Sequence, residues 1–280
     1  MNYNQQYIIT SVADNHYAEG VSVMMTPLLH HTAKPADIAF YIIDKGLSEH
    51  YKGYMRQIAA SFHSDLHMIH ADHVPTASIS GSVIQHASFS SLNWYYSLFL
   101  PYIVDPSAAR FLSIDADTVI KTDITALWDE VTVAATDDFG NRLHASRLPI
   151  SGPAQPFDPG LLMVNAQKWR DQHLSEAIFS SMKKDKPITP SAVPRALHMV
   201  LGDQRYSLHP KWNTTTAMFT ETLPATPDGQ PIIEAICAPA VVHFTGKVKP
   251  WHAYCPHPYK YDYEHYRAQW LSLVTLSLSQ

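Results

Sequence analysis

The chain has 280 residues, 46% of them hydrophobic and 16% charged, and its net charge is −5. These values are typical of an ordered globular protein, long enough for one large α/β domain or two small ones. Because no run of Lys and Arg stands out in this acidic chain, nucleic acid is excluded as an expected partner.

Nothing in the sequence indicates export or insertion into a membrane. Residues 1–6 lack the charged and apolar regions of a signal peptide, and no stretch of about 18 apolar residues occurs. Cys237 and Cys255 allow a disulfide, but two cysteines in an otherwise cysteine-free chain favour reduced thiols. We therefore expect a cytoplasmic protein with at most peripheral contact with the inner face of the membrane.

The N-terminal part alternates expected strands and helices. Apolar and β-branched runs predict strands over 7–12, 38–43 and 66–69, with a helix over 18–29 after the first. Ser48 is a suitable N-cap for a second helix that reaches about residue 62. An apolar stripe with helical spacing runs from Leu92 to Ile103, and Pro101 should kink or end that helix. This alternation predicts a doubly wound α/β sheet.

The pattern loosens after residue 117. Residues 140–156, 183–194 and 214–231 are expected to form loops or surface connections, the second because it is rich in proline. A strand is expected over 160–164 and a helix over 169–182. Secondary structure here is therefore less regular than in the N-terminal part.

The apolar run that begins at Phe111 ends in two carboxylates, Asp115 and Asp117. Because side chains alternate along a strand, these carboxylates should point to the same side where the strand ends. Converging carboxylates suit a hard divalent cation, which in turn binds a diphosphate, and ligands of open α/β sheets sit at this edge. The motif therefore indicates a metal-assisted enzyme that acts on a phosphorylated donor, although both residues could instead cap a turn.

Four segments of the chain occur in the order and spacing of a known family. They are residues 13–18, 114–128, 157–169 with 202–213, and 242–251. Together they resemble glycosyltransferase family 8, which contains bacterial lipopolysaccharide hexosyltransferases and glycogenin. The resemblance implies a GT-A fold, which is Rossmann-like, binds a nucleotide-sugar and has a mixed central sheet. It would span residues 1–252, with a short C-terminal extension over 253–280 packed on it.

The resemblance also implies an activity and its cofactor. The family transfers a sugar from a nucleotide-sugar with Mn²⁺ and retains the anomeric configuration. The chain would then be a hexosyltransferase that moves a sugar from a UDP-sugar to a glycan or glycolipid acceptor, in bacterial lipopolysaccharide or capsule synthesis. Mg²⁺ is the alternative metal, but a His beside carboxylates suits Mn²⁺ better.

The family's motifs give roles to residues that bind the nucleotide and the metal. By resemblance, Asp14 and Tyr17 would contact the nucleoside, with Tyr17 stacked on the base. Asp115 and Asp117 would hold the metal and the ribose, and His243 would be the third metal ligand. These assignments come from the motifs and not from spacing alone.

Other motif residues would bind the diphosphate and the sugar. Gly246 and Lys249 would receive the diphosphate, whose negative charge grows as the anomeric C–O bond breaks. Asp203 and Gln204 would lie beside the sugar as the catalytic pair. A glutamine is a poor nucleophile, which favours front-face attack by the acceptor hydroxyl, with Gln204 stabilising the cationic sugar and Asp203 binding hydroxyls. Asp158, also in the donor site, stands where the family has Asn.

Several positions depart from the family pattern. Ser97 replaces an Arg that contacts donor phosphate and sugar, Arg205 stands where an acidic residue is common, and His16 stands where Asn is frequent. The metal and diphosphate elements are therefore better preserved than those that recognise the sugar. We expect a donor preference that differs from galactosyl and glucosyl, or is relaxed. Arg205 would restore the cation lost at Ser97 only if its side chain points inward.

Two alternatives remain at this stage. The departures at Ser97, Asp158 and Arg205 suit a homologue that binds nucleotide-sugar or glycan with weak or no turnover. The run from Asp115 to Thr118 also resembles the DxDxT motif of haloacid dehalogenase-type phosphatases, in which Asp115 would be the nucleophile and Asp117 the acid. That family places the motif after its first strand, whereas several α/β units precede it here.

Overall fold

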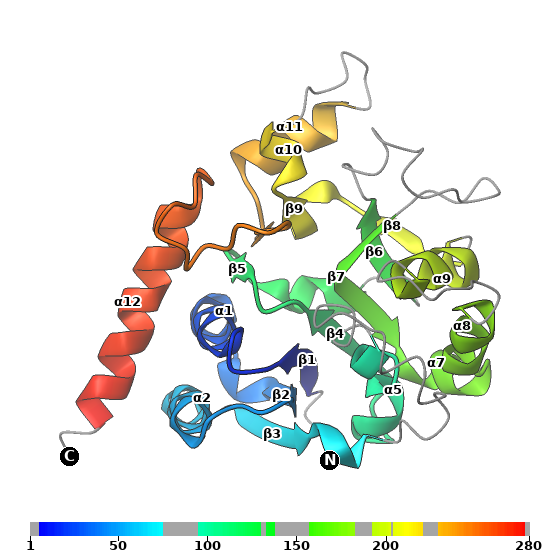
Figure 1. The fold of residues 1–280 in the computed structure, drawn as a ribbon, viewed down its shortest axis with the longest axis horizontal. Helices are drawn as coiled ribbons and strands as arrows, with labels where there is room; N and C mark the ends of the chain where they lie inside the picture. The colour runs from blue at the N-terminus through cyan, green and yellow to red at the C-terminus, as the bar shows by residue number, and fades with distance from the viewer. Residues whose placement is uncertain are drawn as a thin grey trace.

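The structure is a computed structural model that describes residues 6–74, 95–129, 133–137, 157–182, 192–202, 204–220 and 229–277. At its centre is a sheet of seven strands, with helices on both faces (Figure 1). In spatial order the strands are β3 (Asp65–His70), β2 (Ile38–Asp44), β1 (Tyr7–Ala13), β4 (Arg110–Ile114), β7 (Phe157–Asn165), β6 (Val133–Asp137) and β8 (Tyr206–Leu208). The predicted strands over 7–12, 38–43, 66–69 and 160–164 all lie within these elements and are confirmed.

One half of the sheet is parallel. Strand β1 pairs in parallel with both β2 and β4, and β2 pairs in parallel with β3. All of β2 is buried, because helices or strands cover it on every side, and this explains its continuous apolar sequence. Helices α1 (Ala18–His31) and α2 (Glu49–Ser61) pack on one face of this half. The Ser48 hydroxyl caps α2 by accepting a hydrogen bond from the Tyr51 amide, which confirms the predicted start of that helix.

The other half is mixed. Strand β7 is antiparallel to β4 and to β6, while β8 is parallel to β6. The second face of the sheet packs on helices α5 (Leu100–Ile103), α7 (Ala166–Asp171), α8 (Leu174–Met182) and α9 (Ala192–Leu201). An apolar layer therefore covers each face of the sheet. The carboxyl ends of β1 and β4 lie at the edge of the sheet between these two layers.

A small second sheet lies beside the first. It consists of β5 (Thr118–Ile120), β10 (Val241–His243) and β9 (Thr214–Thr215), with β10 in the middle. Helices α10 (Ala217–Thr220) and α11 (Gln230–Cys237) flank it, and short 3₁₀ helices complete the fold: η1 (Pro35–Asp37), η2 (Ala71–His73), η4 (Ile124–Asp129) and η6 (Pro210–Asn213). This sheet joins three segments that are far apart in the sequence.

The C-terminal helix α12 (Lys260–Ser277) packs along α1 and α2 (Figure 1). The Tyr263 side chain is fully buried there, and its hydroxyl donates to Glu19 Oε1 at 3.1 Å. The predicted division of the chain at residue 252 stays a prediction. None of the described helices is both long enough and apolar enough to cross a membrane.

Prolines mark several boundaries of the expected elements. The helix expected from Leu92 to Ile103 is interrupted at residues 98–99, just before Pro101, as predicted, and Pro101 itself lies in the first turn of α5. Pro194 and Pro231 likewise lie in the first turns of α9 and α11, inside segments expected to be loops. A proline there loses no helical hydrogen bond, since the first turn's amides have no partner. Residues 140–156 lie outside the described residues.

The helix expected over 169–182 is two helices. Helices α7 and α8 meet at His173, whose φ of 50° breaks the helical path. The apolar pattern continues through the break because both helices pack on the same face of the sheet.

Candidate active site

The segment from Asp115 to Asp117 crosses from β4 in the large sheet to β5 in the small one. The Asp115 amide donates to Gly160 O at 2.8 Å, and the Phe244 amide donates to Asp117 O at 2.9 Å. The Thr118 hydroxyl donates to Asp115 O at 2.9 Å. Backbone hydrogen bonds from β7 and from the end of β10 therefore hold both carboxylates at the junction of the two sheets.

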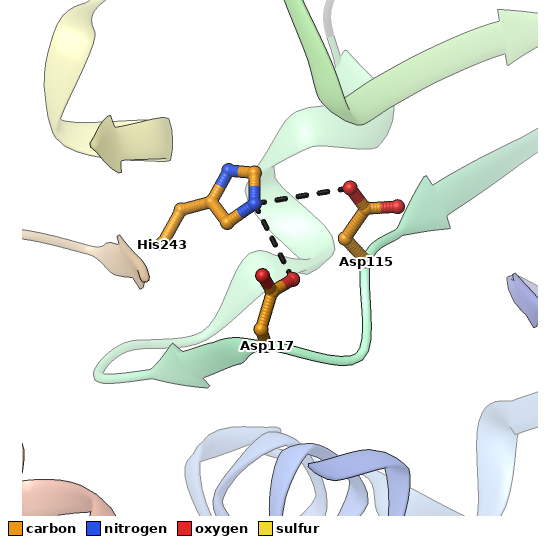
Figure 2. A group of neighbouring side chains, drawn as sticks. All are labelled: Asp115, Asp117 and His243. Carbon is orange, nitrogen blue, oxygen red and sulfur yellow. Dashed lines mark ion pairs between the residues drawn. The ribbon is translucent and has the colours of Figure 1, made fainter. Parts of the chain in front are cut away.

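The His243 imidazole, at the end of β10, faces both carboxylates (Figure 2). Its Nε2 lies 3.8 Å from Asp115 Oδ2 and 3.4 Å from Asp117 Oδ1. One ligand atom from each residue lies within 4.8 Å of the others, which is close enough for all three to bind one ion. Two carboxylate oxygens and an imidazole nitrogen are a donor set that suits a borderline divalent cation such as Mn²⁺.

The charges at this junction are strongly coupled. Burial and the neighbouring charge of Asp117 raise the pKa of Asp115 to about 7. Burial disfavours ionisation of Asp117, but the cations of His243 and Lys249 outweigh it and hold the Asp117 pKa far below its usual range. Burial also disfavours the His243 cation, yet the carboxylates of Asp158 and Asp117 raise its pKa well above the ordinary value. A carboxyl that titrates near neutral pH beside a second carboxylate indicates that the site lacks positive charge, which a divalent cation would supply.

Lys249 comes from the loop that follows β10. Its Nζ forms an ion pair with the Asp117 carboxylate and donates to Phe244 O at 3.0 Å. Although burial lowers the pKa of Lys249, the Asp117 carboxylate raises it above its ordinary value, so the side chain is a cation. Gly246 has a φ of 92°, a conformation that a side chain disfavours, and it turns this loop back over the carboxylates.

The second ring nitrogen of His243 contacts a residue to which the sequence gave no role. His243 Nδ1 lies 3.0 Å from Asn213 Oδ1, and Asn213 Nδ2 donates to Asp158 Oδ1 at 3.1 Å. Gly160 packs against the same ring, where a Cβ would collide with the imidazole. Asn213 belongs to the motif at residues 211–213, but its partners in space are 30 and 55 residues away, so the motif alone could not show its function.

A cavity of about 240 Å³ opens over these side chains. It is lined by seven of the predicted site residues: Tyr17, Asp115, Asp117, Asp158, His243, Gly246 and Lys249. Away from the carboxylates the lining is mainly apolar, with Leu98, Phe111, Leu162, Trp169 and Leu197, and Ser97 also lies on this wall. The cavity therefore has a charged end at the junction of the sheets and an apolar end under helices α5 and α9.

Asp14 lies behind the cavity and not on its wall, directly after β1. Its Oδ1 accepts hydrogen bonds from the amides of His16 and Tyr17, at 2.9 and 3.2 Å. Its Oδ2 is buried and has no hydrogen-bond partner within the part of the chain that the structure describes. The Tyr17 ring lies beside it, with Trp251 packed edge-to-face at a centroid distance of 5.5 Å.

Two described residues near the predicted sugar position, Gln204 and Arg205, do not line the cavity. Gln204 is exposed after α9, with its amide donating to Val200 O at 3.4 Å, and Asp203 lies outside the described residues. The Arg205 guanidinium forms an ion pair with Asp137 and lies 5.2 Å from the centre of the Phe157 ring. Arg205 therefore does not replace the cation lost at Ser97, and the roles of Asp203 and Gln204 stay predictions.

The mixed sheet, with a cavity and a possible metal site beyond the carboxyl end of β4, has the arrangement of a glycosyltransferase of the GT-A type. The family model described as "Glycosyl transferase family 8" matches residues 8–255, and the chain belongs to that family. It is therefore a glycosyltransferase, as the motifs predicted, and the phosphatase alternative is wrong.

Relatives agree with this assignment. General stress protein A of Bacillus subtilis (strain 168) is 28% identical over 97% of both chains. Lipopolysaccharide 1,2-glucosyltransferase of Escherichia coli (strain K12) is 23% identical over 88% of this chain and 72% of its own. The crystal structure of the galactosyltransferase LgtC with donor and acceptor sugar analogues superposes with a TM-score of 0.75, at 20% identity, covering 94% of this chain and 95% of LgtC. The predicted GT-A fold is thus confirmed.

Proposed function

We propose that this protein transfers a hexose from a UDP-sugar to a glycan or glycolipid acceptor, with retention of the anomeric configuration and with Mn²⁺ as its metal. The convergence of Asp115, Asp117 and His243 beside Lys249, in one cavity, carries the proposal. The setting we propose is synthesis of bacterial lipopolysaccharide or capsule on the cytoplasmic side of the membrane. The similarity to a lipopolysaccharide glucosyltransferase supports that setting.

Asp115, Asp117 and His243 would hold the metal, because their ligand atoms already lie within the reach of one ion. A bound divalent cation would supply positive charge next to the diphosphate oxygens. Mg²⁺ is the alternative, but the nitrogen ligand favours Mn²⁺. Metal binding would also offset the repulsion between the two carboxylates.

Asp14 and Tyr17 would hold the nucleoside. The buried Oδ2 of Asp14 has no partner among the described residues and can only accept hydrogen bonds when ionised, so it would suit an N–H donor once the Asp14 side chain turns from behind the cavity wall toward the base. The imide N–H of uracil is such a donor. The Tyr17 ring, supported by Trp251, is half-buried on the cavity wall and offers a face on which the base can stack.

Lys249 and the turn at Gly246 would receive the diphosphate. When the anomeric C–O bond breaks, its electron pair passes to the departing diphosphate, and Lys249 Nζ stabilises the charge that develops there. The acceptor hydroxyl then forms the new bond from the same face of the sugar and gives its proton to an oxygen of the departing diphosphate. Gln204 and Asp203 would support the cationic sugar and its hydroxyls, which requires the exposed Gln204 side chain to turn toward the cavity.

The side chains at the apolar end of the cavity affect which donor sugar is preferred. Ser97 lies there with Leu98 and Leu162, so the described wall has no charged group at this end to bind hydroxyls tightly. Asp158 can only accept hydrogen bonds, whereas an Asn at that position could also donate them. This supports a donor preference that differs from galactosyl and glucosyl or is relaxed.

A second candidate function is nucleotide-sugar or glycan binding without turnover. The position of Gln204 outside the cavity favours it, because a cationic sugar would then lack its proposed partner.

A screen of UDP-hexoses and UDP-N-acetylhexosamines for UDP release, with Mn²⁺ and with chelator, distinguishes the two candidates. We expect Mn²⁺-dependent release with at least one donor, and its loss in Asp117→Ala without unfolding. Tight UDP binding with no release from any donor would support the binding protein. Release that is insensitive to chelator would overturn the metal assignment.

A further inference from the structure

Two buried side chains and the partly exposed Asp158 form a hydrogen-bonded chain behind the candidate metal site. Asn213 is completely buried at the end of η6, and His243 is only 4% exposed. The chain runs from Asp158 Oδ1 through the Asn213 amide to His243 Nδ1, with links of 3.1 and 3.0 Å. The three residues come from the large sheet, from η6 and from the small sheet.

The direction of these hydrogen bonds is fixed from one end. The Gly160 backbone amide, which can only donate, lies 2.8 Å from Asp158 Oδ1. That oxygen must therefore accept, and the group that Asn213 turns toward it must be its NH₂. The Asn213 carbonyl oxygen then faces His243 Nδ1, and a carbonyl can only accept. A reversed amide would put one oxygen against the Asp158 carboxylate and its NH₂ against the ring nitrogen.

We propose that Asn213 is a positioning residue that holds the Nδ1–H of His243, so that a metal displaces the proton on Nε2 and the Nε2 lone pair then points at the metal position between Asp115 and Asp117. The proposal rests on the metal site of the proposed function and adds a residue to it. Histidine ligands commonly donate their other N–H to an oxygen acceptor, which fixes both the tautomer and the ring plane. Gly160 completes the arrangement, because only a residue without a Cβ leaves room for the ring in this plane.

The arrangement also assigns a place to Asp158. Its Oδ1 accepts from Gly160 N and Asn213 Nδ2 inside the protein, while the residue also lines the cavity. Asp158 therefore acts on His243 both directly, with its Oδ1 3.5 Å from Nδ1, and through Asn213. An Asn at position 158 would keep the same oxygen acceptor, because the Gly160 amide would still select it.

Replacement of Asn213 tests the proposal. In Asn213→Leu both the acceptor for His243 Nδ1 and the donor to Asp158 Oδ1 are absent. Thr26→Val removes a buried hydroxyl whose hydrogen bond stays within α1, and it serves as the matched control. The first readout is the Mn²⁺ dissociation constant of the UDP complex, measured by electron paramagnetic resonance of free Mn²⁺. The second is the His243 Nδ1–H signal in ¹⁵N NMR of the metal-free protein, identified by its loss in His243→Ala.

We expect Asn213→Leu to weaken Mn²⁺ binding by about 10- to 100-fold, the range found for outer-shell partners of metal ligands. The Nδ1–H signal should then exchange faster with water, because only Asp158 Oδ1, 3.5 Å from Nδ1, remains as an acceptor, while Thr26→Val keeps both the signal and most of the affinity. UDP binding without metal and the melting temperature verify folding, and Asn213→Ala replaces the Leu variant if that variant does not fold.

Unchanged Mn²⁺ affinity and an unchanged exchange rate of the Nδ1–H signal in folded Asn213→Leu would overturn the inference. Failure of the unmodified protein to bind Mn²⁺ would instead reject the proposed function, since the NMR signal of the metal-free protein reports on Asn213 independently.

Discussion

The two sheets of this protein differ in what their buried residues do. In the large sheet, β2 is buried from end to end, and residues such as Ile38, Phe40 and Ile42 are completely inaccessible. In the small sheet the strands have only two or three residues, and their buried positions include Thr118, Thr214 and His243. Burial of each large apolar side chain contributes about 1.5–3 kcal/mol, so the large sheet supplies most of the folding free energy.

The small sheet instead positions the functional side chains. It holds the carboxylates after β4, the amide before β9 and the imidazole at the end of β10 at one point. Asp115, whose side chain is 43% exposed, lies beside the carboxylates of Asp117 and Asp158, and the resulting repulsion contributes to its raised pKa. The apolar core around the large sheet thus offsets the unfavourable electrostatic interactions at the small sheet. Four predictions test this division, from the largest expected effect to the smallest.

Asp115→Asn should separate function from stability. We expect UDP release from the donor to fall by about a thousandfold or more, because a metal ligand and its charge are lost. The folded-state pKa of Asp115, about 7, lies above the unfolded value of 3.8, so stability falls as pH rises from 3.8 toward 7 and the full loss is present above 7. The variant should therefore melt higher than its parent at pH 8 and equally at pH 4, as measured by calorimetry without metal.

A lower melting temperature of Asp115→Asn at pH 8 would contradict the proposed repulsion. Asp72→Asn, at a carboxylate that is 85% exposed, provides the control and should change neither property.

Ile42→Ala should show the opposite behaviour. The side chain is completely buried in the centre of β2, and its truncation leaves a cavity. We expect the free energy of unfolding to fall by about 2–5 kcal/mol, measured by urea denaturation. The Mn²⁺ and UDP affinities of the folded fraction should stay within about twofold of the parent, since additive effects are usual for distant sites. A selective loss of Mn²⁺ affinity would show that the two sheets are energetically coupled.

Lowering the pH should destabilise the protein through two buried histidines, one beside the large sheet and one beside the small sheet. Burial lowers the pKa of His198, next to β7, and of His257, next to Phe244, each to about 4. Both are neutral in the fold but take up protons when unfolded below about pH 6.5. Stability should therefore fall from pH 6.5 toward pH 4, by up to about 1.4 kcal/mol per pH unit for each histidine.

Urea denaturation of His257→Phe across this pH range measures one of these contributions. We expect the pH slope of this variant to be smaller by up to one proton, and an unchanged slope would show that His257 is charged in the fold. His265→Gln, at an exposed position of α12, is the control and should leave the slope unchanged.

Tyr17→Ala should have the smallest effect. Loss of an aromatic stacking partner costs about 1 kcal/mol, so UDP affinity should fall several-fold in titration calorimetry. Tyr17→Phe keeps the ring and should bind UDP like the parent, while the Mn²⁺ affinity of both variants stays unchanged. Equal UDP affinity in Tyr17→Ala and the parent would remove Tyr17 from the nucleoside site.

The sequence by itself determined the features that depend on neighbours along the chain. The apolar runs of β1 and β2, the Ser48 cap and the paired carboxylates after β4 are local patterns, and each was found where it was expected. The order of the family's motifs also fixed the GT-A fold before the structure was known. Asp115 and His243 are far apart in the sequence. They were assigned to one metal site only because the family resemblance placed them together.

Tertiary structure alone decided which polar groups meet. Asn213 and Asp158 are 55 residues apart, and no local pattern predicts that one amide links a carboxylate to an imidazole. In the same way, the sequence left open whether Arg205 reaches the cavity, and the structure instead buries it against Asp137, 68 residues earlier, outside the cavity lining. Periodicity and turn chemistry report local backbone preferences, whereas hydrogen bonds between distant side chains depend on how the two sheets pack, and that packing is set by the whole chain at once.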